Sequence, residues 1–407
     1  MKHKKISIVG LGYIGLPTAA LLADRGYYVS GFDVSDATVE AINSGLPLIK
    51  EADLEYYVKK NVKTGKLTAK NSIEPGDIYM ICVPTPLKFL DGSPQPNIEM
   101  VMDAASKIFP ILKDGDLVIL ESTCPVGTTQ KIYDLAKNVG VNTDAIHFAY
   151  CPERVLPGHI MKEIVENDRI VGGLTQLATE VVANFYKSFV TGLILETDSK
   201  TAELSKLAEN SFRDVNIAFA NELSMICEED EIDIWEVIKL ANHHPRVNIL
   251  DPGAGVGGHC IAVDPWFIVH QNQIKSRLIR TAREVNTSKT DWVIEKVKKA
   301  AEDFHTETGS VPKITCLGLS YKPNTSDMRE SPALKIVLAI NALKYETEVI
   351  EPNISFHAEV NIQPVETLRS DNDIIVVLVK HKEFMDAAFL NKLKNCVLID
   401  TCGLLEN

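Results

Sequence analysis

The chain has 407 residues, enough for two or three domains of ordinary size. Its composition, 45% hydrophobic and 24% charged, is that of a globular protein. The formal net charge of -13 argues against a nucleic-acid partner, which needs a basic face, and no apolar run approaches the roughly 20 residues of a membrane span.

The start of the chain and its cysteines favour a cytoplasmic protein. The charged beginning leads directly into an apolar run and is too short for a signal peptide. The eight cysteines include no pair with CxxC spacing, and most of them lie in apolar runs. We therefore expect reduced thiols and no disulfide framework.

The N-terminal part alternates short apolar runs with amphipathic segments. We expect buried strands at residues 5–9, 28–32, 78–83, 117–121 and 146–149. Strands that alternate with helices in this way are typical of a parallel sheet with helices on both faces.

A glycine motif follows the first of these strands. It reads Gly10-x-Gly12-x-x-Gly15, and Asp33 ends the next strand. Such glycines let a pyrophosphate approach the N-terminus of the following helix, and an acid about 20 residues further on binds the ribose hydroxyls. The motif predicts dinucleotide binding, with NAD favoured because a carboxylate would repel the 2′-phosphate of NADP. A tight turn without a ligand is the alternative.

Two later strands end in loops that are candidates for ligand contact. The sequence VPTP contains Thr85, and the sequence ESTCPVGT contains Thr123. Both loops follow predicted strands at the carboxyl edge of the sheet, where open sheets bind ligands. Pro and Thr are also ordinary loop residues, so these loops alone leave ligand contact and plain connection equally open.

From about residue 197 the apolar residues recur with helical spacing for roughly thirty positions, without Gly or Pro. A second helical run covers residues 276–304, and strand-like runs return at 313–317, 348–351, 374–379 and 397–400. We predict an α/β fold with two Rossmann-like parallel-sheet domains joined by a central helical domain. The predicted domains are residues 1–196, 197–305 and 306–407.

The first long helix and the loop between the two helical runs carry polar groups that are candidates for ligand contact. Lys206, Asn210 and Arg213 lie at i, i+4 and i+7, hence on one helix face. Their ammonium, amide and guanidinium suit an oxyanion and phosphates, although a solvated polar face would look the same.

The loop PGAGVGGHCIAVDP places Cys260 among glycines, with Asp264 four residues later. Glycine lets a backbone approach a ligand closely, so the loop favours an accessible thiol over a core cysteine. His259 and Cys260 could form half of a zinc site, but no second pair of ligands has the required spacing. We therefore expect no metal.

Seven motifs together resemble one known family. They are GLGYIGLP, ESTCPVGT, YCPERVLPG, KLAENSFRD, NHHPRVNIL, GVGGHCIAVDPWF and LGLSYKPNTSDMRESPA. In this order they resemble the UDP-sugar 6-dehydrogenases, of the UDP-glucose/GDP-mannose dehydrogenase type. His259 before the cysteine is similar to the N-acetylhexosamine enzymes, and YCPERVLPG, HHPRVNIL and VDPWF are most similar to the UDP-N-acetyl-D-mannosamine branch. The UDP-N-acetylglucosamine and UDP-glucose branches are the alternatives.

The resemblance implies oxidation of the sugar's C6 alcohol to a carboxylate with two NAD, for surface polysaccharide synthesis. Cys260 matches the family nucleophile, which captures the C6 aldehyde as a thiohemiacetal that is oxidised to a thioester. The other matching catalytic positions are Lys206 and Asn210 for oxyanion charge, Asp264 and Thr123 for water and protons, and Glu153 for hydrolysis.

The resemblance also implies binding positions and a homodimer. Cofactor contacts match Gly10, Gly12, Tyr13, Ile14, Gly15, Asp33, Thr85, Thr123 and Arg329. Sugar-nucleotide contacts match Arg154, Val155, Lys206, Asn210, Arg213, His244, Arg246, Gly257, Tyr321 and Lys322. His244 and Arg246 are expected to reach the partner subunit's site. Without the resemblance, His244 could be an ordinary loop residue, and Tyr321 could simply pack in a core.

Two other functions remain open at this point. One is a two-electron hydroxyacid-type dehydrogenase, which would not need Cys260 or the second α/β domain. The other is a regulator that binds nucleotide sugars without catalysis, which would not need Lys206 or Asp264. The number of NADH formed per sugar nucleotide separates the three: two, one or none.

Overall fold

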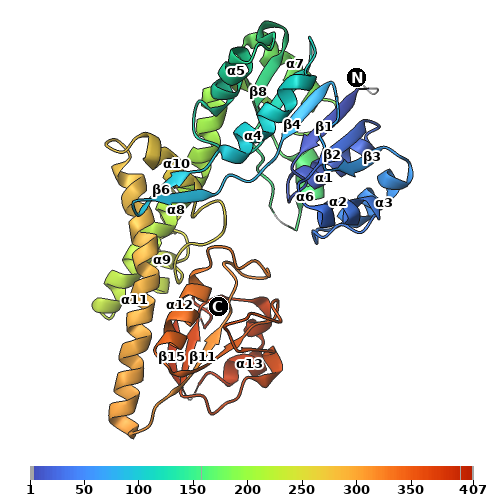
Figure 1. Cartoon of the computed structure of the whole chain (residues 1–407). Coiled ribbons are helices and arrows are strands. Elements are labelled where there is room, and N and C mark those ends of the chain that lie inside the picture. The colour runs from blue at the N-terminus through green and yellow to red at the C-terminus, as the bar shows by residue number, and fades with distance from the viewer. Residues whose placement is uncertain (1–3, 157, 395, 406–407) are drawn as a thin grey trace. The chain divides into compact units, whose positions relative to one another are not determined.

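Figure 1 shows the computed structural model, which describes residues 4–156, 158–394 and 396–405. The chain divides into two compact units, Met1–Ala208 and Glu209–Asn407, and the division lies within the long helix α8 (Ser199–Glu229). Each unit contains a largely parallel sheet. The predicted fold class, α/β with two parallel sheets and long helices between them in the sequence, is confirmed.

The first unit carries an eight-stranded sheet in the order β10-β9-β8-β7-β4-β1-β2-β3. The strands are β1 (Lys5–Val9), β2 (Tyr28–Phe32), β3 (Leu67–Lys70), β4 (Ile78–Ile81), β7 (Leu117–Leu120), β8 (His147–Tyr150), β9 (Arg169–Gly173) and β10 (Ile194–Asp198). Neighbouring strands are parallel except β8 and β9, which pair antiparallel. The five predicted strands are all present, and their ends differ from prediction by at most two residues. A separate antiparallel hairpin consists of β5 (Leu87–Leu90) and β6 (Ser93–Pro96).

Helices pack on both faces of this sheet, as the blue and green ribbons of Figure 1 show. They are α1 (Gly15–Asp24), α2 (Asp36–Asn43), α3 (Leu54–Lys63), α4 (Glu99–Ile108), α5 (Thr128–Asn138), α6 (Ile160–Glu166) and α7 (Gln176–Tyr186). Because side chains alternate along a strand, Met80 of β4 joins the core with Leu16 of α1. Tyr79 of the same strand joins the opposite core with Val101 of α4.

The second unit carries an all-parallel five-stranded sheet in the order β13-β12-β11-β14-β15. The strands are β11 (Lys313–Leu317), β12 (Glu346–Ile350), β13 (Ile362–Gln363), β14 (Ile374–Val377) and β15 (Val397–Asp400). The helices are the rest of α8, then α9 (Ile234–Ala241), α10 (Asp264–Gln271), α11 (Arg277–Thr308), α12 (Pro332–Ala342) and α13 (Ala387–Asn391). The two long predicted helices are therefore present as α8 and α11.

A buried polar network joins α8 to α11 within the second unit. Arg283 of α11 forms an ion pair with Asp214 of α8 at 2.6 Å, and the Asn286 amide donates to the same carboxylate at 2.8 Å. Asn286 in turn accepts a hydrogen bond from Asn221 at 2.9 Å. A buried ion pair needs such additional hydrogen bonds to offset the loss of water. The network fixes the register of the two helices that flank the Cys260 loop in the sequence.

None of the helices in the described ranges combines the length and the apolar character needed to cross a membrane.

Candidate active site

The glycine motif forms a tight turn between β1 and α1. Gly10 has φ +96°, and a Cβ on Gly15 would lie 1.8 Å from the Gly10 carbonyl oxygen. Only glycine permits this close approach. A Cβ on Gly12, in contrast, would meet no protein atom within 4 Å. The space beside Gly12 is therefore open and can hold a ligand.

The N-terminus of α1 is available to an anion. No side chain caps it, and no acidic residue lies in its first turn. The N-terminus of a helix carries partial positive charge that favours a phosphate. Tyr13 is exposed and Ile14 half-buried beside this end. The turn thus has the form that a pyrophosphate requires.

Asp33 lies next to the glycine turn at the end of β2. Its carboxylate accepts hydrogen bonds from the backbone N–H groups of Leu11 and Ser35, both at 3.0 Å. These bonds hold the half-buried carboxylate in place, while its remaining lone pairs can accept hydroxyl hydrogens. The position suits the adenosine ribose of a dinucleotide.

Thr85 and Thr123 lie on the same edge of the sheet as the glycine turn. Thr85 follows β4 and Thr123 follows β7, and the two strands are parallel neighbours, with β4 beside β1. Both threonines are half-buried. The predicted cofactor residues of the first unit therefore lie at one carboxyl edge of the sheet, the edge at which open α/β sheets bind ligands.

Glu203, which the sequence analysis missed, supports the Thr123 loop. It is fully buried on α8, and its carboxylate accepts hydrogen bonds from the Gly127 N–H, the Thr129 N–H (2.8 Å) and the Thr129 hydroxyl (2.7 Å). A carboxylate in this place satisfies the free N–H groups at the start of α5. The start of α5 is thus occupied by the protein's own acid.

Glu153 lies in a buried cluster rather than on an open surface. Its carboxylate forms an ion pair with Arg169 of β9 and accepts the Arg154 N–H at 2.7 Å. Nearby Glu121 accepts the Tyr186 hydroxyl at 2.6 Å, and burial followed by repulsion from Glu153 raises the pKa of the Glu121 carboxyl. Nothing in the spacing of the sequence indicated Arg169, because it begins an unexpected strand.

The residues after Glu153 are also held by the first unit. The Arg154 guanidinium donates to the carbonyl of Asp168, and Val155 packs against the hydrophobic core. Both are half-buried. The loop after β8 therefore has a fixed backbone with its predicted substrate residues close to the surface.

On α8, Lys206 and Asn210 are each only 9% exposed, whereas Arg213 is exposed. Within the second unit, the Asn210 amide donates to the buried carboxylate of Asp264 at 2.5 Å. Asp264 is the first residue of α10. The helix face and the cysteine loop, which the sequence suggested separately, therefore meet at this pair.

The loop that carries Cys260 is anchored to both long helices. The Gly253 N–H donates to Asn221 of α8 at 2.9 Å, and the Thr290 hydroxyl of α11 donates to the Ala254 carbonyl at 3.0 Å. The loop then turns into α10, with the Cys260 carbonyl accepting the Asp264 N–H at 2.8 Å. Cys260 is half-buried in this turn. Its thiol is thus on a fixed backbone, one turn from the Asp264 carboxylate.

Tyr321 packs directly on the glycines before Cys260. A Cβ on Gly257 would lie 2.9 Å from the Tyr321 side chain, and one on Gly258 would lie 2.7 Å from its ring. The Gly258 N–H also donates to the Arg329 carbonyl at 2.9 Å. These glycines are required because the ring lies against the backbone.

Cations gather around this tyrosine. The Lys322 ammonium lies 5.6 Å from the centre of the Tyr321 ring. Burial, and then the charge of Arg213, lower the pKa of Lys322, while burial raises the pKa of Tyr321. Cys260 also interacts electrostatically with both groups. Two cations near the thiol provide the positive field that a diphosphate needs in a chain of net charge -13.

Three further predicted residues lie in loops of the second unit. His244 and Arg246 are exposed on the loop after α9, where the Arg246 N–H donates to His244 Nδ1 at 3.3 Å. Arg329, predicted to contact the cofactor, lies in the second unit and forms an ion pair with Asp327 at 2.6 Å. The other predicted cofactor residues all lie in the first unit.

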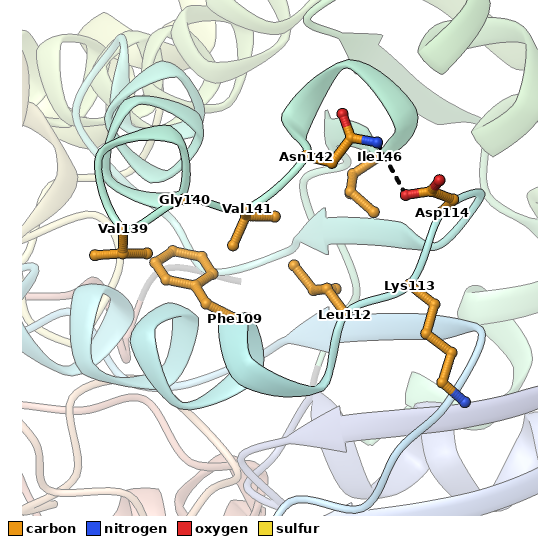
Figure 2. A pocket seen from close by; sticks show the side chains of 9 residues that line it. All are labelled: Phe109, Leu112, Lys113, Asp114, Val139, Gly140, Val141, Asn142 and Ile146. Atoms are coloured by element: carbon orange, nitrogen blue, oxygen red, sulfur yellow. Dashed lines mark hydrogen bonds between the residues drawn. The ribbon is translucent and has the colours of Figure 1, made fainter.

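A pocket of about 300 Å³ in the first unit lies away from all predicted site residues. Figure 2 shows its lining, which includes Leu112 and Asp114 before β7 and Ile146 before β8. It therefore lies at the amino ends of these strands, opposite the edge that carries the glycine turn. Among the described residues, no group of three or more His, Cys, Asp or Glu is arranged to hold a metal ion.

Known proteins share this organisation. Models of the UDP-glucose/GDP-mannose dehydrogenase family match residues 4–190 (NAD binding domain), 200–288 (central domain) and 315–407 (UDP binding domain). The chain is 48% identical over 417 residues to the NDP-N-acetyl-D-galactosaminuronic acid dehydrogenase of Ralstonia nicotianae, covering 98% of this chain and 96% of that protein. It is 48% identical over 403 residues to the UDP-N-acetyl-D-mannosamine dehydrogenase of Escherichia coli K12, covering 94% and 95%.

A solved structure is similar over nearly the whole length. The UDP-N-acetyl-mannosamine dehydrogenase Cap5O from S. aureus has a TM-score of 0.89 and 38% identity, covering 99% of this chain and 96% of that one. The NAD binding model spans the glycine turn and Asp33, and the UDP binding model spans Tyr321 and Lys322. The chain therefore belongs to the UDP-glucose/GDP-mannose dehydrogenase family and is an NAD-dependent UDP-sugar dehydrogenase.

Proposed function

We propose that the chain oxidises UDP-N-acetyl-D-mannosamine at C6 to UDP-N-acetyl-D-mannosaminuronate, a four-electron reaction. The observation that carries this proposal is the turn at Cys260, where a half-buried thiol stands on an anchored backbone beside the Asn210–Asp264 pair. An alcohol dehydrogenase that stops at the aldehyde needs no thiol. An oxidation that continues to the acid benefits from a nucleophile that holds the aldehyde.

NAD, when bound, accepts a hydride from C6 in each of the two oxidations. After the first, the Cys260 thiolate adds to the aldehyde carbon, and the new C–S bond gives a thiohemiacetal whose oxygen takes up a proton. Loss of a hydride and that proton in the second oxidation leaves a thioester. Water then attacks the carbonyl carbon, the C–S bond breaks, and the carboxylate and the thiolate are released.

Buried polar groups on α8 stabilise the charge that develops on the C6 oxygen in this proposal. Lys206 and Asn210 are each 9% exposed, so water screens them little. Fixed donors in such surroundings stabilise an oxyanion far better than they would in water. Asp264, with Thr123, positions the hydrolytic water and carries its proton.

Glu153 supports hydrolysis through the backbone in this proposal. Because its carboxylate is bound to Arg169 and to the Arg154 N–H, it fixes the loop that presents Arg154 and Val155 to the sugar nucleotide. The diphosphate is bound by Arg213 and Lys322, and the uracil end of the substrate by the Tyr321 loop.

Replacing Asp33 with alanine is expected to reduce the preference for NAD over NADP. The wild-type carboxylate accepts ribose hydroxyls and repels a 2′-phosphate, so NAD should support turnover at least tenfold faster than NADP, a difference of about 1.4 kcal/mol. Steady-state kcat/KM with both cofactors measures this gap for wild type and Asp33→Ala. Equal wild-type values for the two cofactors would place the ribose elsewhere.

The mannosamine assignment rests on His259, His244 and Arg246 and on the relatives named for UDP-N-acetyl-D-mannosamine. The relative from Ralstonia nicotianae, named for N-acetyl-D-galactosaminuronic acid, makes UDP-N-acetylgalactosamine the second candidate substrate. A site that hydrogen-bonds an N-acetyl group loses much transition-state binding when this group is missing, because its own polar groups stay unpaired.

We expect kcat/KM for UDP-N-acetyl-D-mannosamine to exceed that for UDP-glucose by about 10⁴-fold. The panel also contains UDP-N-acetylglucosamine and UDP-N-acetylgalactosamine, for which smaller differences are expected because only the ring stereochemistry changes. NADH formation at matched enzyme concentration gives the four values. A preference for UDP-glucose would refute the assignment to the N-acetylhexosamines, and a preference for UDP-N-acetylgalactosamine would favour the second candidate.

A homodimer through α8 completes the proposal. Phe212, Phe219 and Ile226 recur every seven residues on one face of α8 and are 70%, 53% and 49% exposed. Such an apolar stripe marks an interaction surface, and a two-fold pair of identical chains would cover it. Arg246, exposed on the loop after α9, then reaches the other subunit's sugar nucleotide.

Mixed dimers of Arg246→Ala and Cys260→Ala subunits are expected to regain activity that neither variant has alone. If Arg246 acts across the interface, one of the two sites in each mixed dimer carries both wild-type residues. NADH formation after subunit exchange measures the gain, and differently tagged subunits verify the exchange. Verified exchange without a gain would mean that each site is built from one chain.

Each of the three predicted domains has its own role in this proposal. Residues 1–196 bind NAD, residues 197–305 supply the helices and the Cys260 loop, and residues 306–407 bind the UDP group. The product would serve the synthesis of a surface polysaccharide that contains the uronate.

A further inference from the structure

A buried polar cluster lies at the carboxyl edge of the second sheet. Ser320 follows β11, Glu351 follows β12 and His381 follows β14, three neighbouring strands whose ends lie together. The three residues are 1%, 3% and 0% exposed. None of them was singled out by sequence, and none takes part in the chemistry proposed above.

The hydrogen bonds fix the tautomer of His381. Its Nδ1 lies 3.0 Å from the backbone nitrogen of Asn324 and 3.1 Å from the Asn353 side-chain nitrogen. A backbone N–H can only donate, so Nδ1 accepts and the ring proton is on Nε2. Nε2 lies 3.2 Å from Glu351 Oε2 and 3.4 Å from Ser320 Oγ. The imidazole therefore accepts through Nδ1 and donates through Nε2.

The arrangement does not form a Ser-His-Glu hydrolytic triad. In such a triad the carboxylate binds Nδ1 and the serine faces Nε2, whereas here Glu351 and Ser320 both face Nε2. The Ser320 hydroxyl instead donates to the Lys322 carbonyl at 2.8 Å. The cluster is thus turned towards the backbone of one loop.

That loop, residues 319–324, is held by the cluster at several points. Glu351 Oε2 accepts the Leu319 N–H at 2.8 Å, Ser320 binds the Lys322 carbonyl, and His381 receives the Asn324 N–H. Burial raises the pKa of Glu351, but the hydrogen bonds from His381 and from the backbone N–H groups of Asn353 and Leu319 together lower it, which keeps the acceptor ionised. The ring of Phe384, 5.4 Å from that of His381, closes the other side.

The same loop carries Tyr321 and Lys322. Tyr321 packs on Gly257 and Gly258, three and two residues before Cys260. A displacement of the loop would therefore shift both the cation that faces the diphosphate and the ring that supports the cysteine loop. The cluster lies where this loop leaves the carboxyl edge of the sheet.

We infer that His381 is a positioning residue for the sugar nucleotide: by accepting the Asn324 N–H, it holds the Tyr321–Lys322 loop in its binding conformation. The inference rests on the proposed function, because it assigns this loop to the UDP group. It adds a residue without substrate contact whose hydrogen-bonding pattern determines affinity for the substrate.

Two substitutions of His381 separate this role from general packing. Asparagine places an oxygen where Nδ1 is and keeps the acceptor for the Asn324 N–H. Glutamine places an amide N–H where Nε2 is, keeps the donor to Glu351 and loses the acceptor. The readouts are KM for UDP-N-acetyl-D-mannosamine, KM for NAD, kcat, and the Kd of UDP by calorimetry.

For His381→Gln we expect an increase on the order of tenfold in the sugar-nucleotide KM and in the Kd of UDP. For His381→Asn we expect less than a threefold change on the same scale. The NAD KM should stay at the wild-type value in both. Equal effects of the two substitutions, or an effect confined to kcat or to the NAD KM, would overturn the inference.

Thermal unfolding checks that both variants fold. If His381→Gln does not, Ser320→Ala replaces it, because removing one hydroxyl frees the Lys322 carbonyl and leaves the imidazole in place. A several-fold higher Kd of UDP for Ser320→Ala supports the inference, and an unchanged Kd overturns it. Wild-type protein that neither binds UDP nor oxidises the UDP-sugar would refute the proposed function itself.

Discussion

Replacing Cys260 with alanine is expected to abolish four-electron turnover while NAD binding stays intact. The thiol is the nucleophile of the proposal, and loss of one member of a catalytic unit costs on the order of 10³-fold or more in kcat. The predicted NAD residues other than Arg329 lie in the first unit and Cys260 lies in the second, so cofactor affinity should not change. NADH formation and NAD titration of the same preparation measure both.

Cys260→Ser tests the covalent step by accumulation of its intermediate. Its hydroxyl can be acylated, but an ester is hydrolysed more reluctantly than a thioester, so a sugar-nucleotide adduct should accumulate. Intact-protein mass spectrometry after incubation with UDP-N-acetyl-D-mannosamine and NAD detects the added mass. As a matched control, Cys227→Ala removes a buried cysteine of α8 and should leave turnover near wild type. Near wild-type production of uronate by Cys260→Ala would refute the assignment of Cys260 as the nucleophile.

Replacing Asp264 with asparagine is expected to lower kcat by about 10²–10⁴-fold, the usual contribution of a positioned acid or base. Asparagine has nearly the same shape, and its oxygen can still accept the hydrogen bond from the Asn210 amide. The substitution therefore removes the negative charge and the proton acceptor and keeps the pair. Steady-state kinetics with saturating substrate and NAD give kcat.

The control for Asp264 is Asn210→Leu, which removes the donor and leaves the carboxylate. Because a buried carboxylate without its donor is destabilised, we expect that variant to lose thermal stability as well as activity. Asp264→Asn, in contrast, should unfold within a few degrees of wild type. A fall of less than tenfold in the kcat of Asp264→Asn would mean that another group moves the proton.

The strands were predictable where the sheet is parallel and buried. Such strands are continuous apolar runs, and β1, β4 and β7 have nearly all their residues buried. Other strands were missed, and two of them show physical reasons. β9 begins with Arg169 and ends in two glycines, which are uncommon in strands, and β10 is an edge strand whose residues are at most half-buried. Arg169 is accommodated in β9 by Glu153, a partner from another segment of the chain.

The site was predictable where its parts are close in sequence. Cys260 and Asp264 are joined by one turn, and the glycine turn and Asp33 belong to one β-α-β unit. The supporting groups were not predictable, because each depends on a contact between distant segments. Glu153 meets Arg169 only through the antiparallel pairing of β8 and β9, and Glu351 meets His381 only at the edge of the folded sheet.

The number of NADH molecules formed per sugar nucleotide tests the central claim most directly. Purified protein is incubated with limiting UDP-N-acetyl-D-mannosamine and excess NAD until the reaction ends, and the product is identified by mass spectrometry. A four-electron oxidation through Cys260 predicts two NADH for each sugar nucleotide consumed and a carboxylate at C6. One NADH per sugar nucleotide, with an aldehyde as the product, would contradict it.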